Sequence, residues 1–453
     1  MLQNQRNANY SFLIIISLIV LPFNSLPYFN NILGELSYQA TFYPLCIGVI
    51  IWCINTIFRK KIRVPKHNSF LILFVFLLWI LISGIFNTID IAQAFIKGRT
   101  GIERFLNQVI LYLFLILTSL IIYESNRGDK INFFNKISLG LFLSFVVVGI
   151  YSIFEIIGIF FNESIRLTLY QISPYIHSFG HEAYFYIKRV RSVAGEASWL
   201  AIYFIFSFPW IIYFVMRNIK NYVINFFIIG YMFLIIYFTY SRTAYIIILI
   251  QILIYLYMLI KKGLLKLNYK NLIILVLAIL IVILTSSSIL EHFLENVLSL
   301  LDKDYSSNIA RIGSQIAAIQ MGLNNPIFGV GLGQYAFYVK QFMPLWALGN
   351  EEVSAWIDPY NDSIWAPVHS LFARLFAELG IIGLFLWLLL FIILVVDVCR
   401  KVLKMDDKNN IFIGVSLLTS IIGTLLIGFT HDSYRWFMYP FSIGFSWIYL
   451  YKK

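Results

Sequence analysis

Arg242 is the residue whose surroundings most restrict the chemistry it can do. It stands in residues 239–243, which form the whole connection between two long apolar runs, so its guanidinium must stay near their ends. A guanidinium is planar and permanently charged, which suits it to bind a phosphate or pyrophosphate group. The alternative role is an interfacial anchor whose charge reaches lipid headgroups.

Three more arginines stand in polar stretches beside the apolar runs. Arg311 falls on a predicted amphipathic helix, where it could bind one specific phosphate or lipid phosphates in general. Arg189 and Arg191 precede Gly195-Glu196 at the start of another apolar run. They could bind an anionic substrate, or they could form a solvated basic edge.

His369 opens a predicted helix that leads into an apolar run. Its imidazole could accept a proton near neutral pH or orient a phosphate, or it could only cap the helix. Arg374 and Glu378 stand four residues apart on that helix, which is about one turn. We predict that they pair with each other and support the site rather than act in it.

A glycine-rich turn, residues 329–333, is similar to a phosphate-binding loop in composition alone. No predicted strand precedes it, so a dinucleotide site is excluded, and close backbone packing is the simpler explanation. Gly329 and Gly331 are nevertheless kept as candidate substrate-binding positions. The aromatic residues that follow could form an interfacial belt or platforms for sugar rings: Tyr335, Phe337, Tyr338, Phe342, Trp346, Trp356, Tyr360 and Trp365.

Neither metal binding nor disulfide bonding is predicted. Asp302, Asp304, Asp358 and Asp362 lack the compact spacing of a cation site. The three cysteines lie within or beside apolar runs and fit no metal or redox motif.

Composition places these residues in a membrane protein. Of 453 residues 60% are hydrophobic and only 12% are charged, whereas soluble domains have roughly a quarter charged residues. Apolar runs long enough to cross a bilayer predict an all-α polytopic bundle of about twelve spans. They lie at 10–27, 38–57, 69–87, 105–123, 138–161, 197–216, 222–240, 243–260, 271–289, 379–398, 410–430 and 438–451.

Charge in the short loops predicts the orientation. Basic residues concentrate after the second, eighth and tenth runs and at both termini, so that side is assigned to the cytoplasm. The net charge of +12 follows from this retention and does not require nucleic acid. Only Glu155 lies well inside a predicted span, which argues against an ion-coupled transporter.

The chain divides into spans 1–9 (1–289), a large outer loop (290–368) and spans 10–12 (369–453). Within the loop, isoleucines at helical spacing from Ile309 predict a helix along the membrane surface that ends at Asn325-Pro326. Arg311 lies on its second, smaller face. A long polar insertion in a compact chain is usually functional.

The order of these motifs resembles the O-antigen polymerase and ligase superfamily. The resemblance covers about 240 residues, from Arg191 to His431, and rests on four motifs. These are Arg191 to Glu196, Tyr240 to Thr243, Arg311 with 325–331, and His369 with 378–383.

The resemblance implies a metal-independent glycosyltransferase that uses a polyprenyl-pyrophosphate-linked oligosaccharide and needs no cofactor. It implies donor handling and catalysis by Arg242, Arg311 and His369, and less directly by Arg191 and Glu196. Glu196 stands where a small or amide residue is more usual, and it remains a possible base. A bacterial inner membrane location with both termini cytoplasmic follows, with membrane lipid and a chain-length regulator as expected partners.

A polymerase and a ligase differ in the acceptor, and the motifs are common to both. The aromatic loop with mixed charges favours a polymerase with a glycan site specific for its repeat unit. A flippase for lipid-linked oligosaccharide is the alternative that is not an enzyme, but it would need a polar central cavity.

Overall fold

The computed structural model describes residues 2–29, 36–59, 63–125, 129–181, 188–265, 306–361 and 364–451. The predicted span 271–289 and the start of the outer loop, with Asp302 and Asp304, lie outside this part of the chain. Asp362 lies outside it as well.

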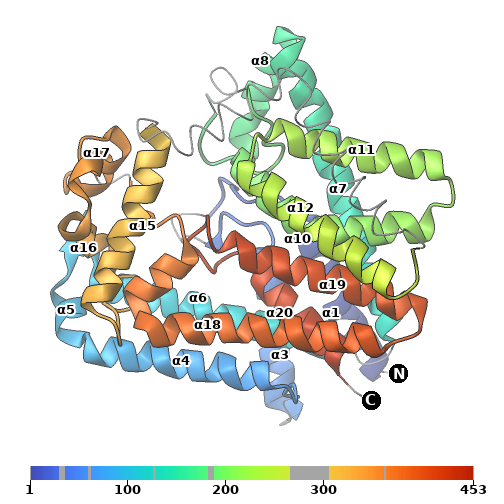
Figure 1. Ribbon diagram of the computed structural model, residues 1–453, viewed down its shortest axis with the longest axis horizontal. Coiled ribbons are helices and arrows are strands. Elements are labelled where there is room, and N and C mark those ends of the chain that lie inside the picture. Colours follow the sequence, from blue (N-terminus) through green and yellow to red (C-terminus); the bar gives the residue numbers. More distant parts are fainter. Residues whose placement is uncertain are drawn as a thin grey trace.

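The described chain is almost entirely helical, and each predicted span within it contains a helix (Figure 1). The helices before the outer loop are α1 (Leu2–Ile19), α3 (Phe42–Arg59), α4 (Asn68–Phe86), α5 (Thr88–Gln93), α6 (Gly101–Ser125), α7 (Lys130–Phe160), α8 (Glu163–Ile172), the 3-10 helix η2 (Ser173–Tyr175), α10 (Ala197–Asn218), α11 (Tyr222–Phe238) and α12 (Arg242–Lys261). Those after it begins are α15 (Ser306–Asn324), α16 (Tyr335–Phe342), the 3-10 helix η3 (Leu345–Ala347), α17 (Glu351–Ile357), α18 (Leu371–Lys404), α19 (Lys408–Ile427) and α20 (Met438–Leu450).

In the described part of the chain, seven helices are long and apolar enough to cross a membrane: α4, α6, α7, α10, α12, α18 and α19. Shorter apolar helical stretches lie at Tyr10–Ile19, Phe42–Phe58 and Tyr222–Phe238. The predicted all-α polytopic membrane fold is therefore confirmed. Figure 1 shows both ends of the chain at the same end of the bundle.

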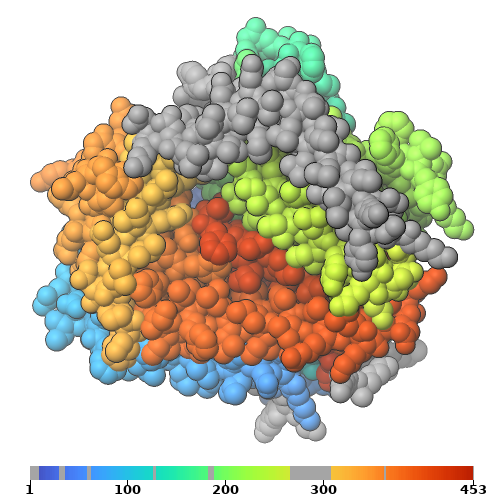
Figure 2. All heavy atoms as spheres, in the orientation of Figure 1, coloured from blue at the N-terminus to red at the C-terminus, as the bar shows by residue number. Residues whose placement is uncertain are grey.

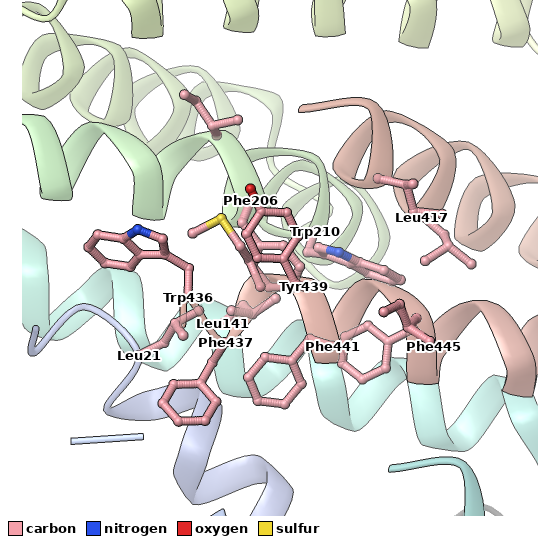
Figure 3. Packing of buried hydrophobic residues seen from close by; sticks show 14 of the residues in the cluster. Leu21, Leu141, Phe206, Trp210, Leu417, Trp436, Phe437, Tyr439, Phe441 and Phe445 are labelled. Atoms are coloured by element: carbon pink, nitrogen blue, oxygen red, sulfur yellow. The ribbon is translucent and has the colours of Figure 1, made fainter. Parts of the chain in front are cut away.

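Aromatic packing fills the centre of the bundle. Trp210 of α10 is fully buried and stacks on Phe134 of α7, with ring centroids 5.7 Å apart. Phe441 and Phe445 of α20 pack against the same group (Figure 3). Large buried rings dominate the apolar contribution to such a core, and their fixed shapes hold the helices in register.

Helix α15 of the outer loop packs against helix α18, which crosses the bundle beside α4 (Figure 1). Helix α18 bends at Gly380, whose φ of 68° is open to glycine but strained for other residues. A Cβ at Gly380 would lie 2.1 Å from the carbonyl oxygen of Ile327. The bend therefore lets the loop backbone approach α18 closely.

A small hairpin adds the strands β1 (Phe95–Ile96) and β2 (Arg99–Thr100), paired antiparallel. Its two turn residues, Lys97 and Gly98, both have positive φ, as a tight hairpin turn requires. Lys97 is buried, and its Nζ donates to the carbonyl oxygens of Ala355 and Ile364 at 3.0 and 2.7 Å. The hairpin is thus fastened to the outer loop.

Candidate functional site

The segment 188–196 is organised by Glu155 of α7, the acidic residue that the sequence placed well inside a predicted span. Its carboxylate accepts the backbone N–H groups of Arg191 and Ser192, the latter at 2.6 Å. The Arg191 side chain is only 5% exposed and donates from Nη1 to the carbonyl oxygen of Gly180 at 2.6 Å. Arg191 therefore shapes this segment from inside the protein.

Arg189 lies beside the α11–α12 turn. Its Nε donates to the carbonyl oxygen of Thr239 at 2.8 Å, and the next residue, Val190, donates from its backbone to Phe238 at 2.8 Å. Arg242 is the first residue of α12, after the N-cap Ser241, whose hydroxyl accepts from Ala244 N–H at 3.4 Å. These contacts bring Arg189 and Arg242 to the same turn.

Arg311 reaches the site from α15, and its side chain is exposed. The predicted smaller face of this helix packs toward the start of α18. Gln315 donates to the carbonyl oxygen of His369 at 3.0 Å, and Gly322 lies so close to Phe376 that a Cβ would be 2.5 Å from the ring. The predicted isoleucine face is more open, with Ile312 and Ile319 both 44% exposed.

Electrostatic effects show that these residues share one region. Burial lowers the pKa of Arg189, Arg311 and Arg242 lower it further, and Glu196 raises it. Burial also lowers the pKa of His369, to about 4, with Asp432 opposing this and Arg311 reinforcing it. Arg311 therefore lies within electrostatic reach of both Arg189 and His369. Figure 2 shows α12 (yellow-green) and α15 (yellow-orange) on one face, with the red C-terminal segment between them.

His369 is held in a strained backbone conformation with φ of 57°, which is rare for a residue with a side chain. Its ring lies against Trp356, with centroids 5.6 Å apart. Its Nε2 atom is buried and has no hydrogen-bond partner in the described part of the chain. The helix cap that His369 could have supplied is instead Ser370, whose hydroxyl accepts from Ala373 N–H. The lowered pKa leaves the imidazole neutral at pH 7.

Two residues that the sequence did not mark as site residues, His431 and Asp432, lie in this region. Asp432 accepts the backbone N–H of Val368, the neighbour of His369, at 2.7 Å. Burial would raise the pKa of Asp432, but Arg374 and the Val368 N–H bring it below its usual value. Burial lowers the pKa of His431 to about 3. The sequence offered two signals for them: their place in a short polar connection between two apolar runs, and a family resemblance that extends to His431.

Gly329 and Gly331 have their closest contacts with α18 and α5, and not with the arginines of the site. A Cβ on Gly329 would lie 2.3 Å from the backbone of Glu378, and Gly331 donates to the carbonyl oxygen of Glu378 at 2.9 Å. The predicted pair of Arg374 and Glu378 is confirmed, with Nε and Oε2 3.1 Å apart. The glycine turn therefore docks on the helix that carries this pair.

Beside His369 lies a cavity of about 220 Å³. Its charged lining residues are Arg104, Arg374, Glu378, Asp432 and Arg435, and Trp365 forms part of its wall. Among the described residues, no three His, Cys, Asp or Glu side chains gather closely enough to hold a metal ion.

Together these groups can bind a polyanion at the arginines and accept a proton at His369. Residues 226–388 match the model of a protein family described as O-antigen ligase. The match contains Arg242, Arg311 and His369 and leaves Arg189, Arg191 and Glu196 outside it. No curated protein matches the chain.

Proposed function

This chain belongs to the O-antigen polymerase and ligase superfamily, and from that premise we propose that it is a polymerase. It joins polyprenyl-pyrophosphate-linked repeat units by glycosyl transfer at the outer face of the bacterial inner membrane, with both termini in the cytoplasm. The observation that carries the proposal is that Arg311 lies close enough to affect the pKa of both Arg189, at the α11–α12 turn, and His369.

The arginines bind the diphosphate of the donor. Transfer breaks the bond between the anomeric carbon and the diphosphate oxygen, and negative charge develops on that leaving group. The guanidinium groups gathered at this site stabilise this charge where it develops. Like charges held together in the free protein also favour binding of an anion, since the anion relieves their repulsion.

His369 accepts the proton of the acceptor hydroxyl as the new glycosidic bond forms. Its lowered pKa keeps it neutral and therefore able to take a proton. A bound diphosphate raises its basicity, since a nearby negative charge favours the protonated form. Glu196 is the alternative base. It is exposed, and its carboxylate accepts a hydrogen bond from the Ser198 hydroxyl at 2.9 Å.

The direct test is extension of a defined lipid-linked repeat unit by purified protein, with and without a chelator. Arg311→Lys should lower transfer roughly 10²–10³-fold, the cost of losing a leaving-group donor, with the amount of protein in the membrane unchanged. Gln320→Ala, an exposed change on the same helix, is the matched control. Normal turnover by Arg311→Lys would overturn the assignment, and loss of activity with chelator would overturn metal independence.

A ligase is the second candidate, because the matched family is described as O-antigen ligase. It would transfer the lipid-linked glycan to lipid A–core instead of to another repeat unit. Deleting the gene distinguishes the two. Loss of a polymerase leaves single repeat units on the core, whereas loss of a ligase leaves bare core and stranded lipid-linked polymer.

A further inference from the structure

A lysine from the connection between α4 and α6 is buried against the outer loop. Lys97 lies in the turn of the β1–β2 hairpin and is only 7% exposed. An ammonium group that leaves water must replace its hydrogen bonds within the protein, so its partners show what it holds. Its Nζ donates to the carbonyl oxygens of Ala355 and Ile364 at 3.0 and 2.7 Å. Lys97 therefore joins two separate points of the outer loop.

The first point is the end of a helix. Ala355 lies in the last turn of α17, where the carbonyl oxygens of a helix lack partners within it. Lys97 supplies a donor there, and its positive charge is favourable at this end of a helix. The next residue, Trp356, is only 6% exposed, and its ring centroid lies 5.6 Å from that of His369. Lys97 thus fixes the turn of α17 whose tryptophan packs against His369.

The second point begins the stretch of chain that leads into His369. Ile364 is followed by Trp365, whose ring is covered by two guanidinium groups. Arg99 of β2 and Arg104 of α6 supply them, at 4.9 and 4.8 Å from the ring centroid. Strand β2 runs directly into α6, which crosses the bundle. The hairpin therefore holds this stretch of the outer loop to a long helix of the bundle.

The backbone and the ring of His369 are held by different contacts. Gln315 donates to the His369 carbonyl oxygen at 3.0 Å, and Ser314 donates to the Val368 carbonyl oxygen at 3.1 Å. The imidazole instead packs on Trp356, and its Nε2 is buried without a hydrogen-bond partner in the described part of the chain. An imidazole that lacks a hydrogen bond at this atom depends on packing to keep its orientation.

We propose that Lys97 is a positioning residue for His369. By joining Ala355 to Ile364, it keeps Trp356 against the imidazole, and the hairpin anchors this arrangement to the bundle through α6. Lys97 acts through Trp356 and takes no part in making or breaking bonds. The inference rests on the proposed function only for its meaning in catalysis, because the same contacts hold the imidazole whatever reaction the site performs.

The cover over the imidazole is tested by its reactivity toward diethyl pyrocarbonate, on the full-length protein in lipid nanodiscs. Peptide mass spectrometry gives the modification rate at each histidine. A covered ring reacts when the loop opens, so its rate reports the open fraction. Lys97→Met keeps the length of the side chain and removes its donors. We expect the rate at His369 to rise at least about tenfold, which corresponds to roughly 1.4 kcal/mol, while the rate at His67, the N-cap of α4, stays unchanged.

Further variants separate positioning from general loosening. Lys97→Arg should restore protection, because a guanidinium can donate to both carbonyl oxygens. Lys340→Met is the matched control, since Lys340 is exposed on α16 of the same loop. A thermal midpoint identifies misfolding of Lys97→Met, in which case Lys97→Gln, which keeps an amide donor, gives the reading with a smaller rise. Unchanged protection of His369 in the well-folded variant overturns the proposal, and so does an equal rise at His67.

Transfer measured on the same variants separates this inference from the proposed function. Lys97→Met should lower kcat roughly tenfold or more and leave the KM for the lipid-linked donor within about twofold, because the arginines that bind the diphosphate are unchanged. Lys97→Arg should recover kcat. If His369 loses protection while transfer stays normal, His369 is not the base and the proposed function fails, whereas positioning by Lys97 stands. If protection is unchanged, positioning by Lys97 fails, and the proposed function does not depend on it.

Discussion

Arg311 precedes His369 in the sequence and Arg374 follows it, and the two arginines have different surroundings. Arg311 is exposed, and in the described part of the chain its guanidinium makes no hydrogen bond or ion pair. Arg374 is largely buried and donates to Glu378, Gln108 and the Asp432 carbonyl. Arg374, whose charge is paired with that of Glu378, holds the start of α18 in place. Arg311, which is exposed, is available to bind an anion.

The difference follows from desolvation. A guanidinium that leaves water must recover its hydrogen bonds inside the protein, so its partners become part of the fold. An exposed guanidinium retains its water and can exchange it for a ligand. Substitutions among the partners of Arg374 should therefore lower the stability of the fold. Substitutions at Arg311 should instead lower the rate of glycosyl transfer.

The largest effect is expected on catalysis from His369→Asn. Asparagine tolerates the positive φ at this position, so the backbone is kept while the base is removed. We expect kcat to fall roughly 10²–10⁴-fold, measured by extension of a lipid-linked repeat unit. The thermal midpoint should stay near that of wild type. Transfer within a few-fold of wild type would remove His369 from the mechanism.

Glu378→Gln should instead reduce stability. It removes the carboxylate that pairs with the buried Arg374, which costs roughly 3–5 kcal/mol of unfolding free energy. Thermal unfolding in detergent measures the change. Glu352→Gln, at an exposed acid of α17, is the matched control and should leave the midpoint unchanged. An equal response of both variants would contradict the division of roles.

Gln315→Ala tests how α15 positions the base. It removes the hydrogen bond from Gln315 to the His369 carbonyl, worth roughly 0.5–1.5 kcal/mol. We expect kcat to fall up to about tenfold with KM nearly unchanged. Gln320→Ala on the same helix serves as the comparison. A change confined to KM would indicate that Gln315 acts on substrate binding instead.

The pH dependence is the smallest expected effect. Because the pKa of His369 is lowered to about 4, the base form persists well below pH 6.5. The acid limb of kcat/KM should lie below pH 6.5, toward 4, since that limb reports the free enzyme. The stability linked to the neutral imidazole is complete above pH 6.5 and is lost as pH falls toward 4. An acid limb at pH 6.5 or higher would show that burial does not control this histidine.

Local patterns in the sequence determined much of this protein. The apolar runs predicted a helix in each span that the structure describes. The four-residue spacing of Arg374 and Glu378 predicted their ion pair. Asn325-Pro326 marked the end of α15, which the structure has at Asn324. Such features depend on interactions within a turn or two of helix, which is the range that periodicity can report.

Only the tertiary structure decided which charges meet. Arg189 and Arg191 are two residues apart, yet one lies at the α11–α12 turn and the other is buried, because Glu155 on α7 binds the backbone N–H groups of Arg191 and Ser192. Asp432 reaches Val368 across 64 positions of chain. These approaches depend on how apolar helices pack against one another, and nearly uniform apolar faces carry little information about their neighbours. The sequence therefore determined the helices and their local pairs, and packing assembled the site.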